Sequence, residues 1–131
     1  MTIPLSLLAV HFVGDFLLQA DWMAQGKSKN TRAGLIALTT HVLVYSLCFM
    51  WLGFYFTALT FVTHWATDFV TSRITSRLIP FVPDDTENSI ELYNMNWQDG
   101  RSNHWFFVTI GFDQLLHYTT LALTYVLLFG V

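Results

Sequence analysis

Three pairs of histidine and aspartate are the residues in this sequence whose types and spacing could do chemistry. In each pair the two residues are four positions apart, which places both side chains on one face of a helix, about one turn from each other. Imidazole and carboxylate groups are the ligands that bind zinc, manganese or iron in proteins. A further histidine, His41, lies between the first two pairs. The pairs are His11 with Asp15, His64 with Asp68, and Asp113 with His117.

The composition places these residues in an apolar protein. Of the 131 residues, 53% are hydrophobic and 11% are charged, whereas soluble domains contain roughly 25% charged residues. The mean hydropathy is +0.46, and we therefore expect an integral membrane protein and not an ordinary cytosolic enzyme. The net charge of −3 argues against nucleic-acid binding. The single cysteine, Cys48, excludes an intrachain disulfide and a thiolate zinc cluster.

Four stretches of the chain are apolar and long enough to cross a bilayer, which takes about 20 residues. No Asp, Glu, Lys or Arg occurs between Arg32 and Asp68, and Gly53 is the expected turn between two helices there. Residues 80–103 contain two prolines and an acidic run, which indicates a loop. The sequence therefore predicts an all-α fold with a single transmembrane domain over residues 1–131. The four expected helices of this polytopic bundle span about 3–20, 34–53, 55–78 and 104–130.

The six basic residues predict the orientation of the bundle. All of them fall in or beside the two loops that this topology places on one side, and the positive-inside rule makes that side cytoplasmic. We expect a multi-pass protein of the inner membrane of a bacterium or a phage host. Loops 21–33 and 79–103 would be cytoplasmic, and both termini would lie outside. The first helix lacks a basic leader and a small-residue cleavage site, so we expect it to be retained.

The polar residues of the four spans are expected to lie in one layer. At ~1.5 Å per residue, most of them lie about 6–14 Å below the inner surface of the membrane. Ionisable groups in hydrocarbon cost several kcal/mol each, so they pair, line water or bind a ligand. We therefore predict an internal site for one or two divalent ions, zinc or manganese. The predicted metal ligands are His11, Asp15, His41, His64, Asp68, Asp113 and His117.

Hydrolysis of a phosphate ester is the reaction that such a site favours, because paired metal ions activate water and neutralise phosphate charge. The substrate would be a lipid headgroup or another phosphorylated molecule that enters from the inner leaflet. Gln19 and Gln114 are expected to hydrogen-bond to the ligands, and Arg73 is expected to hold the phosphate. The predicted catalytic carboxylates are those of Asp15, Asp68 and Asp113, one of which would act as the base.

Two other functions remain open from the sequence. The chain could be a non-enzymatic membrane protein of a phage or bacterium, in which the polar layer packs helices together or engages a membrane partner. It could also be an ion or proton conduit, although residues 44–52 and 125–131 place few polar groups in the outer half. A homodimer or a complex with a host membrane protein is a further alternative, because 15.1 kDa is small for a complete membrane enzyme.

Three segments carry a resemblance to a known family, namely HFVGDFLLQADWMAQGK, HWATDF and FDQLLH. Outside residues 80–103, the chain resembles the bacterial and phage membrane proteins of domain of unknown function 3307. Where that family often has a lysine after the middle aspartate, this chain has Thr71, with Arg73 two residues later. A looser similarity is to membrane-bound, metal-dependent hydrolases of bacteria. The family pattern corresponds here to His11, Asp15, Gln19, Trp22, Lys27, His41, His64, Asp68, Asp113, Gln114 and His117.

Overall fold

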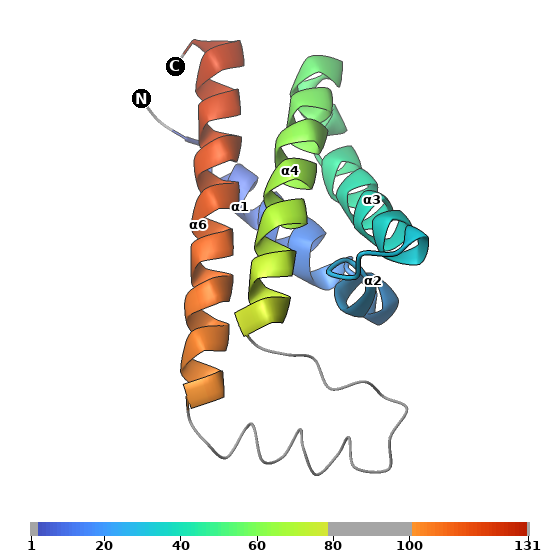
Figure 1. The fold of residues 1–131 in the computed structure, drawn as a ribbon. Helices are drawn as coiled ribbons and strands as arrows, with labels where there is room; N and C mark the ends of the chain where they lie inside the picture. Colours follow the sequence, from blue (N-terminus) through green and yellow to red (C-terminus); the bar gives the residue numbers. More distant parts are fainter. Residues whose placement is uncertain (1–2, 79–100, 131) are drawn as a thin grey trace.

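The computed structural model describes residues 3–78 and 101–130, and every regular element in these ranges is a helix (Figure 1). The all-α fold predicted from the sequence is therefore confirmed for this part of the chain. In chain order the elements are α1 (Leu5–Phe12), the π-helix η1 (Val13–Leu17), α2 (Asp21–Gly26), α3 (Arg32–Leu47), the 3₁₀-helix η2 (Met50–Leu52), α4 (Phe54–Leu78) and α6 (Arg101–Phe129).

The long helices alternate in direction along the chain (Figure 1). Helices α4 and α6 lie side by side, α3 packs against α4, and both η1 and α2 contact α3. The turn between α3 and α4 lies at the same end of the bundle as the start of α1 and the end of α6. At this turn Gly53 adopts a φ of 101°, a conformation that glycine tolerates and other residues rarely adopt. The segment between α2 and α3 lies at the opposite end.

The first expected helix is interrupted by a π-turn, which the sequence analysis did not predict. The N–H of Leu18 bonds to the carbonyl of Val13 at 3.0 Å, five residues back. Wide turns of this type are rare and occur frequently at functional sites. Gly14 lies inside the turn, and a Cβ added there would lie 2.9 Å from Cδ2 of Tyr45. The absence of a side chain at residue 14 therefore lets η1 approach α3 closely.

Other helix boundaries also differ from the expected ones. Helix α3 begins at Arg32 because the side chain of Thr31 caps it, accepting a hydrogen bond from the N–H of Gly34 at 3.1 Å. It ends at Leu47 and not near residue 53, because the chain uses the intervening residues and η2 to reverse direction. The short helix α2 lies in a segment that was expected to be a loop. Helix α6 begins at residue 101, and residues 80–100 of the expected loop lie outside the described ranges.

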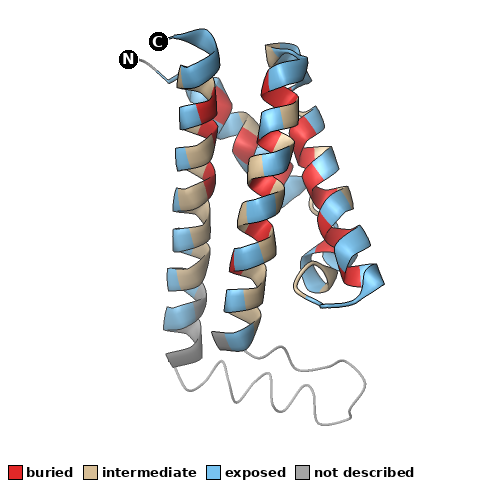
Figure 2. Ribbon diagram, turned by 45° about the horizontal axis from the view of Figure 1, so that its top comes forward, coloured by how far each residue is buried: buried red, intermediate tan, exposed pale blue. Residues whose placement is uncertain are grey.

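The interior of the bundle has an apolar end and a polar middle. Figure 2 shows that the buried residues lie on the sides of the helices that face one another. The apolar cluster lies toward the α3–α4 turn and consists of Leu7, Tyr45, Phe49, Phe56 and Leu121. The buried ionisable side chains are those of His11, Asp15, His41, His64, Asp68 and His117. The core is therefore built around a histidine and aspartate cluster instead of a continuous apolar centre.

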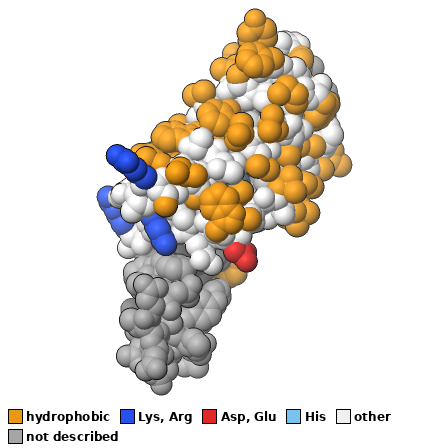
Figure 3. All heavy atoms as spheres, turned by 90° about the vertical axis from the view of Figure 1, so that its right-hand side faces the viewer, with side chains coloured by type: hydrophobic (Ala, Val, Ile, Leu, Met, Phe, Trp, Pro, Cys, Tyr) orange, Lys and Arg blue, Asp and Glu red, His pale blue; other side chains and the backbone are white. Residues whose placement is uncertain are grey.

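The outer faces of the helices are largely apolar. Leu127 of α6, Val62 of α4 and Ile36 of α3 have 80%, 62% and 61% of their surface exposed. Figure 3 shows hydrophobic side chains spread over one face of the molecule, while Lys and Arg side chains gather toward one end. None of the helices within residues 3–78 and 101–130 has both the length and the apolar character needed to cross a membrane.

Candidate metal centre

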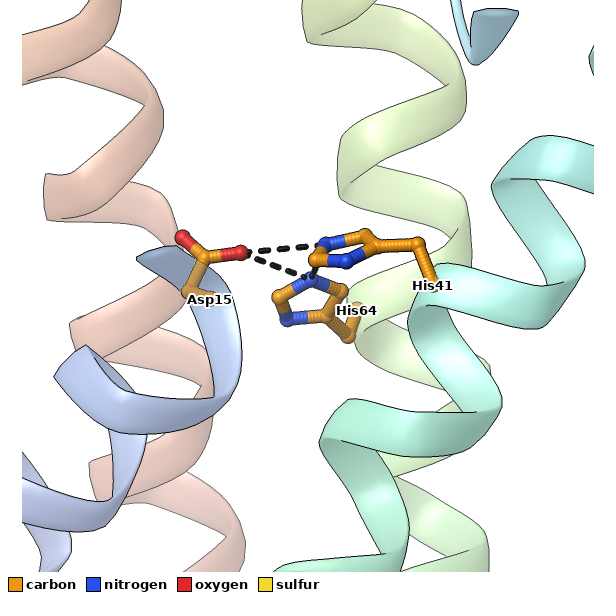
Figure 4. Close-up of side chains that lie close together, drawn as sticks. All are labelled: Asp15, His41 and His64. Atoms are coloured by element: carbon orange, nitrogen blue, oxygen red, sulfur yellow. Dashed lines mark hydrogen bonds and ion pairs between the residues drawn. The ribbon is translucent and has the colours of Figure 1, made fainter. Parts of the chain in front are cut away.

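One carboxylate and two imidazoles from three different elements converge in the polar middle of the bundle (Figure 4). Asp15 comes from η1, His41 from α3 and His64 from α4. Oδ1 of Asp15 lies 3.1 Å from Nε2 of His41 and 3.4 Å from Nε2 of His64. The two imidazole nitrogens are 3.3 Å apart. All three side chains are buried, so this first triad is a preformed and enclosed set of ligand atoms.

These separations match those around a tetrahedral metal ion. Zinc bonds to imidazole nitrogen and carboxylate oxygen at about 2.0–2.2 Å, which places neighbouring ligand atoms roughly 3.3–3.5 Å apart in a tetrahedron. The three measured distances between ligand atoms lie between 3.1 and 3.4 Å. An ion could therefore enter the first triad without a large movement of the helices that carry it.

Asp68 on α4 lies beside the first triad and also reaches the next imidazole. Its Oδ2 is 3.4 Å from Nε2 of His41 and 3.7 Å from Nε2 of His64, so it could supply a fourth ligand. Its Oδ1 is 3.0 Å from Nε2 of His117 on α6. The two oxygens of Asp68 therefore face different imidazoles.

A second group of ligand atoms surrounds His117. Its Nε2 lies 3.3 Å from Oδ1 of Asp113, one turn earlier on α6. The hydroxyl of Thr71 donates to the same Asp113 oxygen at 2.5 Å. Nδ1 of His117 is buried and has no hydrogen-bond partner among the described residues, whereas Nε2 lies 3.0 Å from the carboxylate of Asp68 and donates to it, because a carboxylate accepts. The ligand atoms of His64, Asp68 and His117 lie close enough to one another to hold an ion, as do those of Asp15, Asp113 and His117.

A chain of hydrogen bonds holds the carboxylate of Asp15 on the side away from His41 and His64. The amide nitrogen of Gln114 donates to Oδ2 of Asp15 at 2.7 Å, and its Oε1 accepts from Nε2 of His11 at 2.8 Å. Nδ1 of His11 then accepts from the hydroxyl of Tyr45 at 2.7 Å. Because Gln114 occupies Oδ2, the other oxygen of Asp15 is the one that faces His41 and His64. Partners of this kind orient metal ligands and fix their tautomers.

The electrostatics of the cluster are dominated by carboxylates. Asp15, Asp68 and Asp113 lie within one network, and the ammonium of Lys27 contacts Oδ2 of Asp68 at 3.0 Å. Burial acts to lower the pKa of Lys27, but the carboxylates of Asp68 and Asp15 outweigh it and raise that pKa above its ordinary value. Lys27 is therefore a permanent cation at the rim of the cluster.

The structure brings together most of the residues that the sequence analysis selected as metal ligands. Six of the seven lie in the groups described above, and the exception is His11, whose two ring nitrogens are engaged by Tyr45 and Gln114. The π-turn that follows His11 alters the register between it and Asp15, and Nε2 of His11 stays 3.8 Å from Oδ2 of Asp15. His11 is therefore linked to the carboxylate of Asp15 through Gln114 and is not placed as a metal ligand.

The residues expected to support the ligands or hold the phosphate differ in whether they contact the cluster. Gln114 contacts the cluster as expected, whereas Nε2 of Gln19 is buried without a hydrogen-bond partner among the described residues. The guanidinium of Arg73 bonds to the side chain of Asn30 and the carbonyl of Phe69. No contact between Arg73 and the cluster is found in the described part of the chain.

Lys27 and Tyr45 were not assigned to the site from their sequence positions. The sequence places Lys27 in a basic loop that sets topology, and the signal for a role in the site is its place in the family pattern, at the end of HFVGDFLLQADWMAQGK. Tyr45 lies four residues after His41 on α3, so it shares the inward face of that helix. Its ring stacks on His64 with centroids 3.8 Å apart, while its hydroxyl reaches His11.

The fold and the cluster together define an all-helical protein with a buried histidine and aspartate centre that could hold a metal ion. The chain belongs to the family described as protein of unknown function (DUF3307), which it matches over residues 3–131. The family inferred from the three sequence segments is therefore confirmed, and the match also includes residues 80–103, which the sequence resemblance had left out. The membrane character and the similarity to metal-dependent hydrolases stay predictions. No curated protein and no solved structure matches the chain.

Proposed function

We propose that this protein is a metal-dependent hydrolase of phosphate esters, which holds a divalent ion, zinc or manganese, inside a membrane-embedded helix bundle. The observation that carries the proposal is the first triad, in which the ligand atoms of Asp15, His41 and His64 are 3.1–3.4 Å apart. Two imidazoles and a carboxylate are a ligand set that suits both ions, and they leave a position for substrate or water.

The charge of the cluster supports the proposal. The carboxylates of Asp15, Asp68 and Asp113 outnumber the single ammonium of Lys27 in the cluster. Unpaired charge in a protein interior is costly, and it is tolerated where ions pair or coordinate a metal. A divalent cation would place positive charge beside these carboxylates.

The distribution of side chains supports the membrane part of the proposal. Large apolar residues face outward on α3, α4 and α6, while the side chains of His41, His64, Asp68 and His117 on the same helices are buried. In a bilayer this arrangement exposes apolar surface to lipid and keeps ionisable groups inside the bundle. The end where Lys and Arg gather would face the cytoplasm of the bacterium or phage host (Figure 3).

The proposed reaction is the addition of water to a phosphate ester. The water oxygen bonds to phosphorus, the bond from phosphorus to the ester oxygen breaks, and the departing alcohol gains a proton. A divalent ion would polarise a phosphate oxygen and lower the pKa of bound water, and neighbouring carboxylates would accept its proton. Lys27 reaches Asp68 from the segment between α2 and α3 with its side chain partly exposed, so we expect the anionic substrate to enter there.

The proposal is tested with the full-length chain purified in mild detergent. Bound metal is measured by mass spectrometry, and hydrolysis is measured with p-nitrophenyl phosphate and with phosphatidic acid in vesicles. We expect at least one ion per chain and activity that EDTA removes and zinc or manganese restores. His41→Ala and His64→Ala should lose activity and bind less metal than the wild type, while the exposed His104→Ala should keep the activity and the metal content of the wild type.

Two outcomes would separate the parts of the proposal. A metal-free protein after expression and reloading would contradict the metal centre. Stoichiometric metal without hydrolysis of either probe would contradict the hydrolase and leave a metal-binding membrane protein. The location is tested independently, because a chain released from membranes by alkaline carbonate would contradict the embedded bundle.

A further inference from the structure

The surroundings of Asp68 contain ligand atoms for more than one ion. The first triad uses the imidazoles of His41 and His64, which lie 3.4 and 3.7 Å from Oδ2 of Asp68. The opposite oxygen, Oδ1, lies 3.0 Å from Nε2 of His117. A carboxylate whose two oxygens face separate imidazole nitrogens is arranged as a bridge between two ions.

We propose that a second divalent ion binds at His117, Asp113 and Oδ1 of Asp68, with Asp68 bridging it to the ion of the first triad. This inference rests on the proposed metal centre and extends it to a two-metal site. Nε2 of His117 lies 3.0 Å from Oδ1 of Asp68 and 3.3 Å from Oδ1 of Asp113. Each of these two distances is close to the separation of two ligand atoms around one ion.

The packing of the imidazoles keeps the two proposed ion positions adjacent. The rings of His64 and His117 stack with centroids 4.0 Å apart and an angle of 18° between their planes. The Nε2 atoms of His64 and His117 lie 3.7 and 3.0 Å from oxygens of the same Asp68 carboxylate, so ions bound to them would be neighbours. Two-metal sites that act on phosphate esters have ions about 3.5–4 Å apart. Tyr45 stacks on the other face of His64, which fixes that ring further.

The two positions differ in chemistry. The first triad supplies two imidazoles and one carboxylate, whereas the second position would draw on the imidazole of His117, the carboxylates of Asp68 and Asp113 and the nearby hydroxyl of Thr71. Imidazole-rich sites suit zinc, and oxygen-rich sites suit manganese or magnesium. The second position is therefore expected to accept manganese more readily than the first triad does.

The net charge of the cluster indicates that an anion should bind together with the second ion. Two divalent ions, three carboxylates and Lys27 would leave two positive charges in the cluster. A phosphate monoester dianion carries the opposite charge. Phosphate should therefore increase the occupancy of the second position and have little effect on the first.

The test is metal stoichiometry in the full-length detergent-purified protein, measured with and without inorganic phosphate. We expect two manganese ions per chain in the wild-type protein with phosphate, and one in Asp113→Asn or His117→Ala. His41→Ala should also retain one ion, and the Asp21→Asn control on α2 should retain two. Electron paramagnetic resonance provides a second readout, because adjacent manganese ions should give a coupled spectrum and Asp113→Asn should give a single-ion six-line spectrum.

The possible outcomes separate a failure of the second position from a failure of the whole metal centre. One ion per chain in the wild-type protein, lost equally in His41→Ala and Asp113→Asn, would overturn the second position and leave the metal centre intact. No ion in the wild-type protein would overturn both. Circular dichroism of each variant shows whether it folds, and Thr71→Val offers a milder change that should weaken only the second position.

Discussion

Gln114 donates its amide N–H to Oδ2 of Asp15 at 2.7 Å, across 99 positions in the sequence. This bond connects the last helix to the π-turn near the start of the chain. It also fixes which oxygen of Asp15 faces the two imidazoles of the first triad. The ligand geometry of the proposed site therefore depends on a residue that is not itself a ligand.

Replacing Gln114 should weaken metal binding without removing a ligand. In Gln114→Leu, Asp15 loses a hydrogen-bond donor and Nε2 of His11 loses its acceptor. Outer partners of metal ligands typically change affinity about 10–100-fold, and we expect a loss in that range, measured by competition with a chelator. The control is Gln25→Leu, an exposed position on α2. Equal affinities in the two variants would contradict the positioning role.

Gly14→Ala should disturb the centre through packing. The added Cβ would lie 2.9 Å from Cδ2 of Tyr45, so η1 or the tyrosine ring must move, and Asp15 is the next residue in η1. Overpacking of this kind costs about 1–3 kcal/mol, and we expect lower stability together with weaker metal binding. Gly111→Ala has open space around its Cβ and should stabilise the helix by roughly 0.5–1 kcal/mol. Unfolding in detergent mixtures measures both changes.

Tyr45→Phe keeps the ring that stacks on His64 and removes only the hydroxyl that donates to His11. A buried acceptor is then left without its donor, which costs about 1–3 kcal/mol. We expect a loss of that size in the free energy of unfolding, whereas Tyr55→Phe at an exposed position should change it little. If both substitutions have the same effect, the hydrogen bond between Tyr45 and His11 contributes nothing measurable.

Lys27→Met should make the protein more dependent on metal. Removing the ammonium leaves the buried carboxylate of Asp68 without its cation, and we expect the metal-free protein to lose up to about 3 kcal/mol. Added zinc or manganese should restore most of this loss, so the rise in Tm on metal binding should exceed that of the wild type. The exposed Lys29→Met is the matched control. An unchanged metal-induced rise in Tm would contradict the account.

The pH dependence of this pair follows from the raised pKa of Lys27. The ammonium is charged in the folded and the unfolded chain below the ordinary lysine pKa, so its stabilising contribution is fully present there. That contribution is lost only as the pH rises through the raised pKa of the folded state. In the metal-free protein, the stability difference between wild type and Lys27→Met should therefore be constant near neutrality and shrink in strong alkali.

The sequence predicted the parts of the structure that depend on local pattern. The four-residue spacing within each pair places His64 beside Asp68 and Asp113 beside His117 on a helical face, and the structure keeps both pairs together. The long apolar stretches also predicted the alternating helices and the reversal at Gly53. These features follow from helical periodicity and from a single glycine, so they need no knowledge of distant contacts.

The remaining features depend on contacts between distant segments. The π-turn at residues 13–17 has no sequence signature beyond Gly14, whose role is set by the approach of Tyr45. The pairing of Lys27 with Asp68 joins two elements that periodicity treats separately. The position of His11 behind Asp15 depends on Gln114 from the far end of the chain. Tertiary packing therefore decided which of the predicted polar residues face one another.

The most direct test of the central claim is zinc X-ray absorption spectroscopy of the full-length protein loaded with one equivalent of zinc. The account predicts a first coordination shell of nitrogen and oxygen at about 2.0–2.2 Å, with the outer-shell scattering of two imidazoles. The imidazole signal should fall by half in His41→Ala or His64→Ala and stay unchanged in His104→Ala. Zinc that shows no imidazole scattering, or the same spectrum in all three variants, would contradict a metal centre at Asp15, His41 and His64.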